Sequence, residues 1–242
     1  MEMMHDVKID GVSARSLGLL ADQLPPVPMA AQRFASYAVG ADEDMTVQDD
    51  SFDDIAYTVT LRIAGNPKRT DNTALYRLIQ NAKKLKLSTL PKYFFRVKHI
   101  SGIVPDSKLR GNEMIYSVTF ALSPWKYIDA EPDVTITGSG VVTNNGTRYC
   151  KPVYTVSLSA NYGTGHLKVN NQDLTITIPE ASAVSDGKII IDADKEIAYS
   201  STGTNMTLCT AGIFRFLAVG QNTVQCTGIC TGVTIKRNGR CY

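Results

Sequence analysis

Apolar and polar residues alternate along two stretches in the first half of the chain. From Ile55 to Ile63 every second residue is apolar, and Gly65-Asn66-Pro67 follows. The same alternation runs from Met114 to Ser123, directly before Pro124. A period of two is typical of a β-strand with one buried face, and proline cannot donate a hydrogen bond to a strand ladder. We therefore predict two antiparallel strands, and we expect the second to end at Pro124, where the chain leaves a first domain.

The segment between these strands changes to helical spacing. Its apolar residues recur three or four positions apart, at Leu75, Leu78, Ile79, Ala82 and Leu85. Thr70 or Asn72 can cap the first turn, so one helix is predicted here. Residues 94–103 then predict another strand. Residues 104–112 are polar and rich in turn-forming residues, which indicates a connection or a projecting arm.

Two earlier stretches have no regular period. Residues 24–28 contain three prolines, which fix φ and remove donors, so we expect an extended segment that lies over a surface. An acidic run follows at Asp42, Glu43, Asp44, Asp49, Asp50, Asp53 and Asp54. A calcium loop needs glycine at its sixth position and glutamate at its twelfth, and no such frame starts at Asp42 or Asp44. A solvated loop is predicted instead.

The second half consists of short apolar runs between turn signals such as Asn144-Asn145-Gly146 and Asp186-Gly187. The predicted strands cover residues 134–137, 154–158, 165–169, 174–178, 188–192, 196–199, 213–219, 223–226 and 232–236. Strands with no helical period between them predict an antiparallel sandwich. The chain should thus be mainly β, with an N-terminal β-sandwich-like domain containing one helix (residues 1–128) and a C-terminal antiparallel β-sandwich (residues 129–242). A length of 242 residues is enough for two cores.

Charge and cysteine content narrow the class of protein. The net charge of +2 is too small to favour either an acidic or a basic partner. Basic residues cluster at residues 83–98 and 236–240, and we interpret them as solvated faces, because a nucleic-acid surface needs aromatic residues within a broader basic stripe. No apolar run approaches the roughly 20 residues of a membrane span, and no secretory signal is recognised. The five cysteines are expected to be reduced thiols of a protein made in the cytosol.

No set of residues indicates catalysis. His5, His99 and His166 have no metal-ligand spacing, and the chain has no nucleophile elbow, phosphate-binding loop or dinucleotide fingerprint. We predict no enzyme activity, no cofactor and no metal. Carbohydrate binding stays open as an alternative, since sugars stack on exposed aromatic rings. The tryptophan, Trp125, is expected in the linker; the other candidates are Tyr149, Tyr154, Tyr162 and Tyr199, of which Tyr154 belongs to an apolar face.

Several motifs, in this order, resemble the distal tail proteins of long, non-contractile-tailed bacteriophages and prophages. In the first half these are residues 11–19, 25–28 and 52–59, the single helix, and the segment Val118-Thr119-Phe120-Ala121-Leu122-Ser123-Pro124-Trp125. In the second half they are Asn145-Gly146-Thr147, Lys151-Pro152-Val153-Tyr154, Ile189-Ile190-Ile191-Asp192 and Phe216-Leu217-Ala218-Val219-Gly220-Gln221-Asn222. The resemblance covers nearly the full chain and implies a galectin-like C-terminal domain.

The resemblance also implies a structural role at the virion tail tip, after synthesis in the host bacterial cytoplasm. Six copies would form a ring between the tail tube protein and the tail-associated hub or lysin protein, with receptor-binding proteins as further partners. It implies neither specific nucleic-acid binding nor membrane insertion. We expect a subunit or axial boundary along residues 94–122, with candidate interface residues Phe94, Val97, Val104, Lys108, Arg110 and Tyr116. The acidic run from Asp42 to Asp54, with Asp42, Glu43 and Asp44 as its named residues, is expected to face the central channel, where like charge lets DNA slide.

Overall fold

The computed structural model describes residues 5–21, 23–37, 45–63, 73–105, 114–182 and 184–242. Internal contacts divide the chain into two compact units. Unit 1 is Met1–Asp129 together with Tyr242, and unit 2 is Ala130–Cys241. Each unit has its own hydrophobic core. The expectation that residues 1–128 and 129–242 fold as independent domains stays a prediction.

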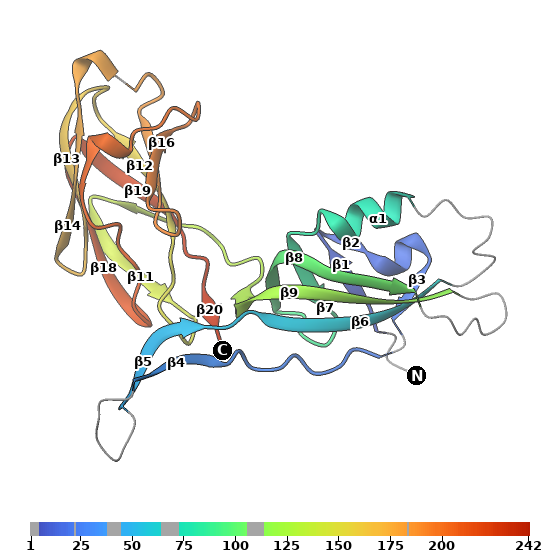
Figure 1. Ribbon diagram of the computed structural model, residues 1–242. Helices are drawn as coiled ribbons and strands as arrows, with labels where there is room; N and C mark the ends of the chain where they lie inside the picture. Colours follow the sequence, from blue (N-terminus) through green and yellow to red (C-terminus); the bar gives the residue numbers. More distant parts are fainter. Residues whose placement is uncertain (1–4, 22, 38–44, 64–72, 106–113, 183) are drawn as a thin grey trace. The chain divides into compact units, whose positions relative to one another are not determined.

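Unit 1 is built on a curled antiparallel sheet (Figure 1). Its strand order is β2 (Val12–Ser13), β1 (Val7–Ile9), β7 (Lys84–Leu87), β8 (Tyr93–Pro105), β9 (Met114–Ile128), β6 (Ile55–Ile63) and β3 (Leu19–Ala21). One 3-10 helix, η1 (Ala14–Leu17), and one α-helix, α1 (Thr73–Gln80), accompany it. Along the described residues α1 is the one α-helix, as the sequence predicted.

The central strand pair confirms the alternating pattern. Tyr57, Val59 and Leu61 of β6 lie opposite Phe120, Val118 and Tyr116 of β9, and all six side chains are buried. Side chains of directly opposite residues share one face of a sheet, so the apolar positions of the two strands form a continuous core layer.

The predicted end of the strand at Pro124 is wrong. β9 continues to Ile128, and Trp125 is a buried residue of this strand rather than part of a linker. Pairing with β6 stops at Leu122, and the register with β8 shifts between its partners Leu122 and Lys126. Pro124 therefore occupies a bulge, which is one of the few places where a sheet tolerates proline.

The helix is shorter than its apolar spacing predicted. α1 ends at Gln80, and Leu85 belongs to β7. Leu85 and Leu87 also fit a period of two, and the burial of β7 alternates because Lys84 and Lys86 point to the other face. The proposed capping residues Thr70 and Asn72 lie outside the described residues.

The acidic run is not a loop throughout. β5 (Met45–Phe52) contains Asp49 and Asp50, and it pairs with β4 (Gln32–Tyr37) in a two-stranded sheet of its own. Met45-Thr46-Val47 favours strand structure, and a partner strand satisfies its backbone groups. The predicted position of residues 24–28 over a surface is confirmed: the segment has no regular structure, and Leu24 and Val27 pack against the core of unit 1.

Unit 2 consists of two five-stranded antiparallel sheets. One has the order β10 (Val134–Thr137), β19 (Cys230–Lys236), β12 (Val153–Leu158), β15 (Lys188–Asp192) and β16 (Ile197–Ser200). The other has the order β11 (Ser139–Asn144), β18 (Gly220–Gly228), β13 (Gly163–Val169), β14 (Gln172–Ile178) and β17 (Thr210–Gly212). Short elements are η3 (Glu180–Ser182), η4 (Thr207–Cys209) and β20 (Arg240–Cys241).

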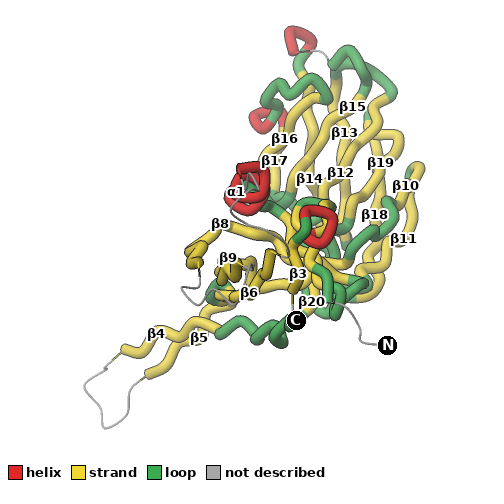
Figure 2. The backbone as a smooth tube through the Cα atoms, turned by 90° about the vertical axis from the view of Figure 1, so that its right-hand side faces the viewer, coloured by secondary structure: helices red, strands yellow, loops and turns green. Residues whose placement is uncertain are grey.

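Figure 2 traces the backbone of the two sheets of unit 2, and the buried side chains of both sheets form one core. Tyr154 and Ile191 from the first sheet and Leu167 and Ile176 from the second belong to the same buried cluster. The predicted fold class is therefore confirmed: the chain is mainly β, and its C-terminal part is an antiparallel sandwich. The predicted strand at residues 213–219 is wrong, because only Leu217 there forms a bridge, with Cys150.

Candidate interaction surfaces

A groove of about 620 Å³ opens on unit 1 beside the proline-containing segment. Residues 24–30 form one side of it, and Phe52, Trp125 and Tyr242 contribute aromatic rings. Lys126 adds a cation to this otherwise largely apolar lining. A volume of this size is in the usual range for binding pockets, so the groove can take a large apolar group.

Three aromatic rings hold the floor of the groove together. The ring centroids of Phe52 and Trp125 are 4.7 Å apart, and those of Trp125 and Tyr242 are 5.5 Å apart. Both pairs meet edge to face, which is a favoured arrangement of aromatic rings. These residues are far apart in the sequence, so no local pattern could have predicted the groove.

A hydrogen bond fixes the proline-containing segment, residues 24–30, which forms one wall of the groove. The hydroxyl of Tyr57 donates to the carbonyl oxygen of Pro25 at 2.9 Å. Burial raises the pKa of Tyr57 to about 12, so this hydroxyl keeps its proton at physiological pH. The wall is thus held over the sheet by a donor that does not titrate.

The β4–β5 hairpin extends away from the curled sheet of unit 1 (Figure 1). At its base, Nε of Arg33 lies 2.6 Å from Oδ1 of Asp53. Phe34 on β4 is 61% exposed. An isolated two-stranded hairpin is marginally stable in water, and an exposed phenylalanine on it offers apolar surface to another molecule.

The predicted interface residues have different environments. Phe94 is partly buried, and its ring stacks on Tyr127 with centroids 5.4 Å apart. Val104 is exposed near the end of β8. Lys108 and Arg110 lie outside the described residues, as does most of the predicted arm.

Val97 and Tyr116 are buried in the core of unit 1. The hydroxyl of Tyr76 donates to that of Tyr116 at 3.1 Å, and burial raises the pKa of Tyr116 to about 12. Neither side chain offers free surface within the single chain. The interface along residues 94–122 stays a prediction, and its exposed candidate in the described part is Val104.

The predicted channel residues Asp42, Glu43 and Asp44 also lie outside the described residues. Their proposed position facing a channel stays a prediction.

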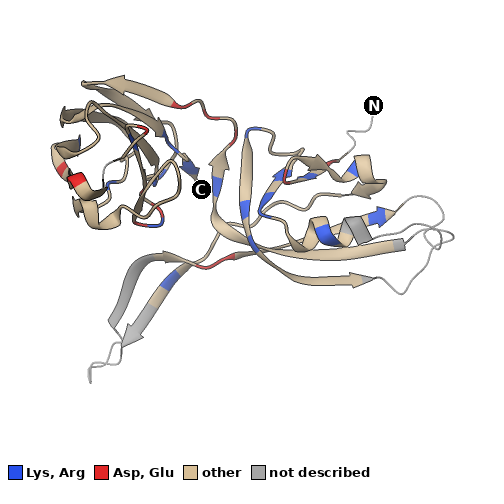
Figure 3. Cartoon of the chain, turned by 90° about the horizontal axis from the view of Figure 1, so that it is seen from above, with Lys and Arg blue, Asp and Glu red and all other residues tan. Residues whose placement is uncertain are grey.

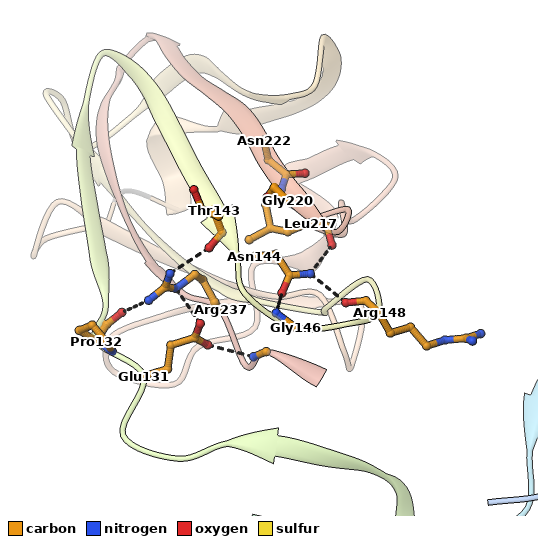
Figure 4. A network of polar contacts seen from close by, with 11 residues as sticks. Glu131, Pro132, Thr143, Asn144, Gly146, Arg148, Leu217, Gly220, Asn222 and Arg237 are labelled. Atoms are coloured by element: carbon orange, nitrogen blue, oxygen red, sulfur yellow. Dashed lines mark hydrogen bonds and ion pairs between the residues drawn. The ribbon is translucent and has the colours of Figure 1, made fainter. Parts of the chain in front are cut away.

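Polar groups in unit 2 are used to hold loops (Figure 4). The buried side chain of Asn144 accepts a hydrogen bond from the backbone N–H of Gly146 at 2.9 Å and donates to the carbonyl oxygens of Arg148 and Leu217 at 2.9 and 3.3 Å. Asn222 accepts from the N–H of Ala218 at 2.8 Å. These asparagines explain two motifs that the sequence singled out, because each forms the centre of a tight turn.

The four tyrosines considered for sugar binding differ in their exposure and contacts. Tyr154 is buried, as predicted, and its hydroxyl donates to the carbonyl oxygen of Arg215. Tyr149 stacks on Phe216 with ring centroids 5.3 Å apart, and Tyr162 is 52% exposed. Tyr199 is partly buried.

A separate polar hollow of about 420 Å³ lies on the sheet containing β11, β18 and β13. Lys168, Asn171 and Gln225 contribute to its lining. Sequence reasoning missed it because β11 was not predicted: Gly138-Ser139-Gly140 has the composition of a turn.

No group of three or more His, Cys, Asp or Glu side chains in the described part of the chain could hold a metal ion. His166 instead lies with Nδ1 2.8 Å from Oδ2 of Asp173. All five cysteines are free thiols, and four of them are buried. Within the described residues, no helix is long and apolar enough to cross a membrane.

Comparison with solved structures decides the fold family. The crystal structure of SPP1 Dit (gp 19.1), a paradigm of hub adsorption apparatus in phages that infect Gram-positive bacteria, aligns with a TM-score of 0.70. The alignment covers 96% of this chain and 98% of that chain. The chain has the Dit fold. The sequences are 15% identical, and no protein-family model and no curated protein sequence matches this chain. The likeness to Dit therefore rests on the arrangement of strands.

Proposed function

We propose that the chain is a structural hub protein at the distal tip of a long, non-contractile phage or prophage tail. The observation that carries this proposal is the structural match to SPP1 Dit over nearly the full length of both chains. A shared single domain would fit many functions, since common folds are reused widely. A match that includes two successive units in the same order is more specific.

The proposed role is assembly rather than catalysis. Six copies form a ring that joins the tail tube protein to the tail-associated hub or lysin protein, and receptor-binding proteins attach around it. The notable polar groups of unit 2, Asn144 and the Glu131–Arg237 pair, make contacts that hold the fold. Contacts that hold the fold are what a structural protein requires.

Electron microscopy of tails from the producing strain tests the proposal, with an antibody against this chain as the label. We expect label at one tail end only, the end distal to the head. Label along the tube, on the head, or only on free protein would refute the proposal.

The hairpin and the groove support the ring. In the described part of the chain, Phe34 on the β4–β5 hairpin is exposed, and Met29 is an exposed residue of the groove lining. If Phe34 of one copy enters the groove of the next, the contact is heterologous. Repeating a heterologous contact closes a ring when the rotation allows it.

Two variants test this contact. Phe34→Asp removes the apolar group that would be inserted, and Met29→Asp disrupts the groove that would receive it. Both side chains are exposed, at 61% and 78%, so both variants should fold. Each variant alone should be monomeric in solution. Their mixture should give only heterodimers, because one hairpin and one groove remain intact between them. Rings formed by either variant alone would contradict the contact, and Leu208→Asp serves as the matched control at an exposed apolar residue outside the groove and the predicted interface.

Carbohydrate binding by unit 2 is a second candidate, favoured by the polar hollow near Lys168. A glycan array with the full chain and with Lys168→Ala tests it. Binding that the substitution removes would support a saccharide site, and an array without signal would end this candidate.

A further inference from the structure

Basic residues, blue in Figure 3, are concentrated on three neighbouring strands of unit 1, and the burial pattern of these strands places them on the face opposite the core. We call this set the cationic face: Lys8 on β1, Lys84 and Lys86 on β7, and Arg96 and Lys98 on β8. Their neighbours along each strand, such as Ile9, Leu85 and Val97, are buried on the opposite face. Between Lys83 and Lys98 the sequence has six basic residues and no aspartate or glutamate.

The strand register places like charges directly opposite each other. Lys8 is the partner of Lys86 across β1 and β7, and Lys84 is the partner of Arg96 across β7 and β8. Opposed like charges destabilise a sheet, whereas a threonine or a glutamate at one position of each pair would avoid the repulsion. A sequence that departs from local stability in this way marks a functional surface.

Aromatic rings on the same face orient two of the cations. Nζ of Lys84 lies 3.9 Å from the ring centroid of Phe94, and Cζ of Arg96 lies 4.2 Å from that of Tyr127. Such contacts are favourable for lysine and arginine. Because these rings already meet cations and each other, they are poorly placed to stack on nucleotide bases, which single-stranded nucleic-acid surfaces require.

The face already binds carboxylates within the chain. Asp129 contacts Nζ of Lys84 at 2.7 Å and Nζ of Lys86 at 2.6 Å, and Asp54 contacts Lys98 at 2.5 Å. These contacts show that carboxylates fit between the basic side chains. The three strands β1, β7 and β8 themselves contain no aspartate or glutamate, so the face is basic.

We propose that the cationic face docks a partner protein that presents a row of carboxylates. The inference rests on the proposed function in taking this partner to be a neighbouring tail protein. Alternate residues on a strand project to the same face, so the basic side chains of β7 and β8 form rows. An acidic strand or loop of the partner can lie along these rows and place its carboxylates beside them. Charge pairing of this kind sets the orientation and speed of docking more than its final affinity.

Fluorescence anisotropy with a labelled oligo-glutamate peptide and the full chain tests the proposal at low ionic strength. We expect binding that weakens as salt is added. The double variant Lys8→Gln/Lys98→Gln should weaken it by about tenfold, because two partly exposed ion pairs are lost. An oligo-glutamine peptide should not bind, and Arg15→Gln, an exposed cation outside the face, should change nothing.

Three results would overturn the proposal: no binding of the glutamate peptide, equal binding by the double variant, or tighter binding of a DNA duplex than of the peptide. The last result would identify a phosphate-binding surface instead. Thermal unfolding gives a second readout, since Lys8→Gln should raise the Tm by removing its repulsion with Lys86. A failure of tail-tip labelling would refute the proposed function but would leave these binding results unchanged, so the two failures are distinguishable.

Discussion

Nε of Arg237 lies 3.3 Å from Oε1 of Glu131, and both side chains are only 7% exposed. Arg237 also donates to the carbonyl oxygens of Thr143 and Pro132 at 2.9 Å, and Glu131 accepts from the N–H of Gly239 at 3.0 Å (Figure 4). This pair ties the first residues of unit 2 to its last strands. Removing one partner leaves the other charge buried, which costs about 3–5 kcal/mol.

We therefore predict that Arg237→Met lowers the free energy of unfolding of unit 2 by about 3–5 kcal/mol. Hydrogen exchange of unit 2 peptides measures this loss. Lys236→Met, at the exposed neighbouring position, should have little effect. The fluorescence of Trp125, the only tryptophan, reports on unit 1. Its transition should stay in place if the two units fold independently, and a joint shift would contradict independent domains.

Gly146 is predicted to be essential for the turn that follows β11. A Cβ at this position would lie 2.3 Å from the carbonyl oxygen of Arg240, which also accepts a hydrogen bond from Thr147. Gly146→Ala should therefore destabilise unit 2 by about 1–3 kcal/mol, as overpacking does. Urea unfolding measures this, with Gly102→Ala as control because a Cβ there meets nothing within 4 Å. Equal stability of the two variants would show that the Arg240 segment can move aside.

The cysteines should react unequally. Burial raises the pKa of Cys150 and Cys230 to about 12 and that of Cys226 to about 11, so these thiols stay protonated in the folded protein. Cys241 is also buried, whereas Cys209 is partly exposed. Iodoacetamide at neutral pH should label Cys209 first and the other four only after unfolding. Mass spectrometry that finds Cys150 labelled at the rate of Cys209 would contradict the buried arrangement.

Asp129 should make stability depend on pH. Hydrogen bonds from Lys84 and Lys86 hold the pKa of this carboxyl below its usual value of 3.8. A lowered folded-state pKa means that the stabilisation is complete above the unfolded-state value and is lost as the pH falls through the folded-state value. Asp129→Asn should therefore be less stable than the parent at pH 7, and the difference should shrink below about pH 4. Chemical denaturation of both proteins between pH 7 and pH 3 measures this difference in stability. A difference that is constant with pH would contradict the lowered pKa of Asp129.

The sequence predicted those elements whose signal is local. β6 and β10 follow from alternation of apolar and polar residues, and β15 follows from a short apolar run between turn residues. The observed bounds of all three strands agree with the predicted ones. The strand end predicted at Pro124 was wrong. The sheet tolerates proline there because the pairing of β8 with β9 shifts its register, and the residues around Pro124 do not indicate that shift.

The candidate surfaces were harder to predict for the same reason. The groove joins residues 24–30, Phe52, Trp125 and Tyr242, and only the folded chain brings them together. The basic cluster was visible in the sequence, but its aromatic partners became apparent only from the pairing of β7, β8 and β9. Val97 and Tyr116 were expected at an interface because of the ring that the resemblance implies along residues 94–122, and in the single chain both side chains are buried in the core of unit 1.

Native mass spectrometry of the purified chain at increasing concentration tests whether the chain forms a ring. We expect a closed assembly with six times the 26.4 kDa mass of one chain, without a series of larger species. A monomer at every concentration, or an open series of oligomers that never closes, would contradict a ring-forming tail hub.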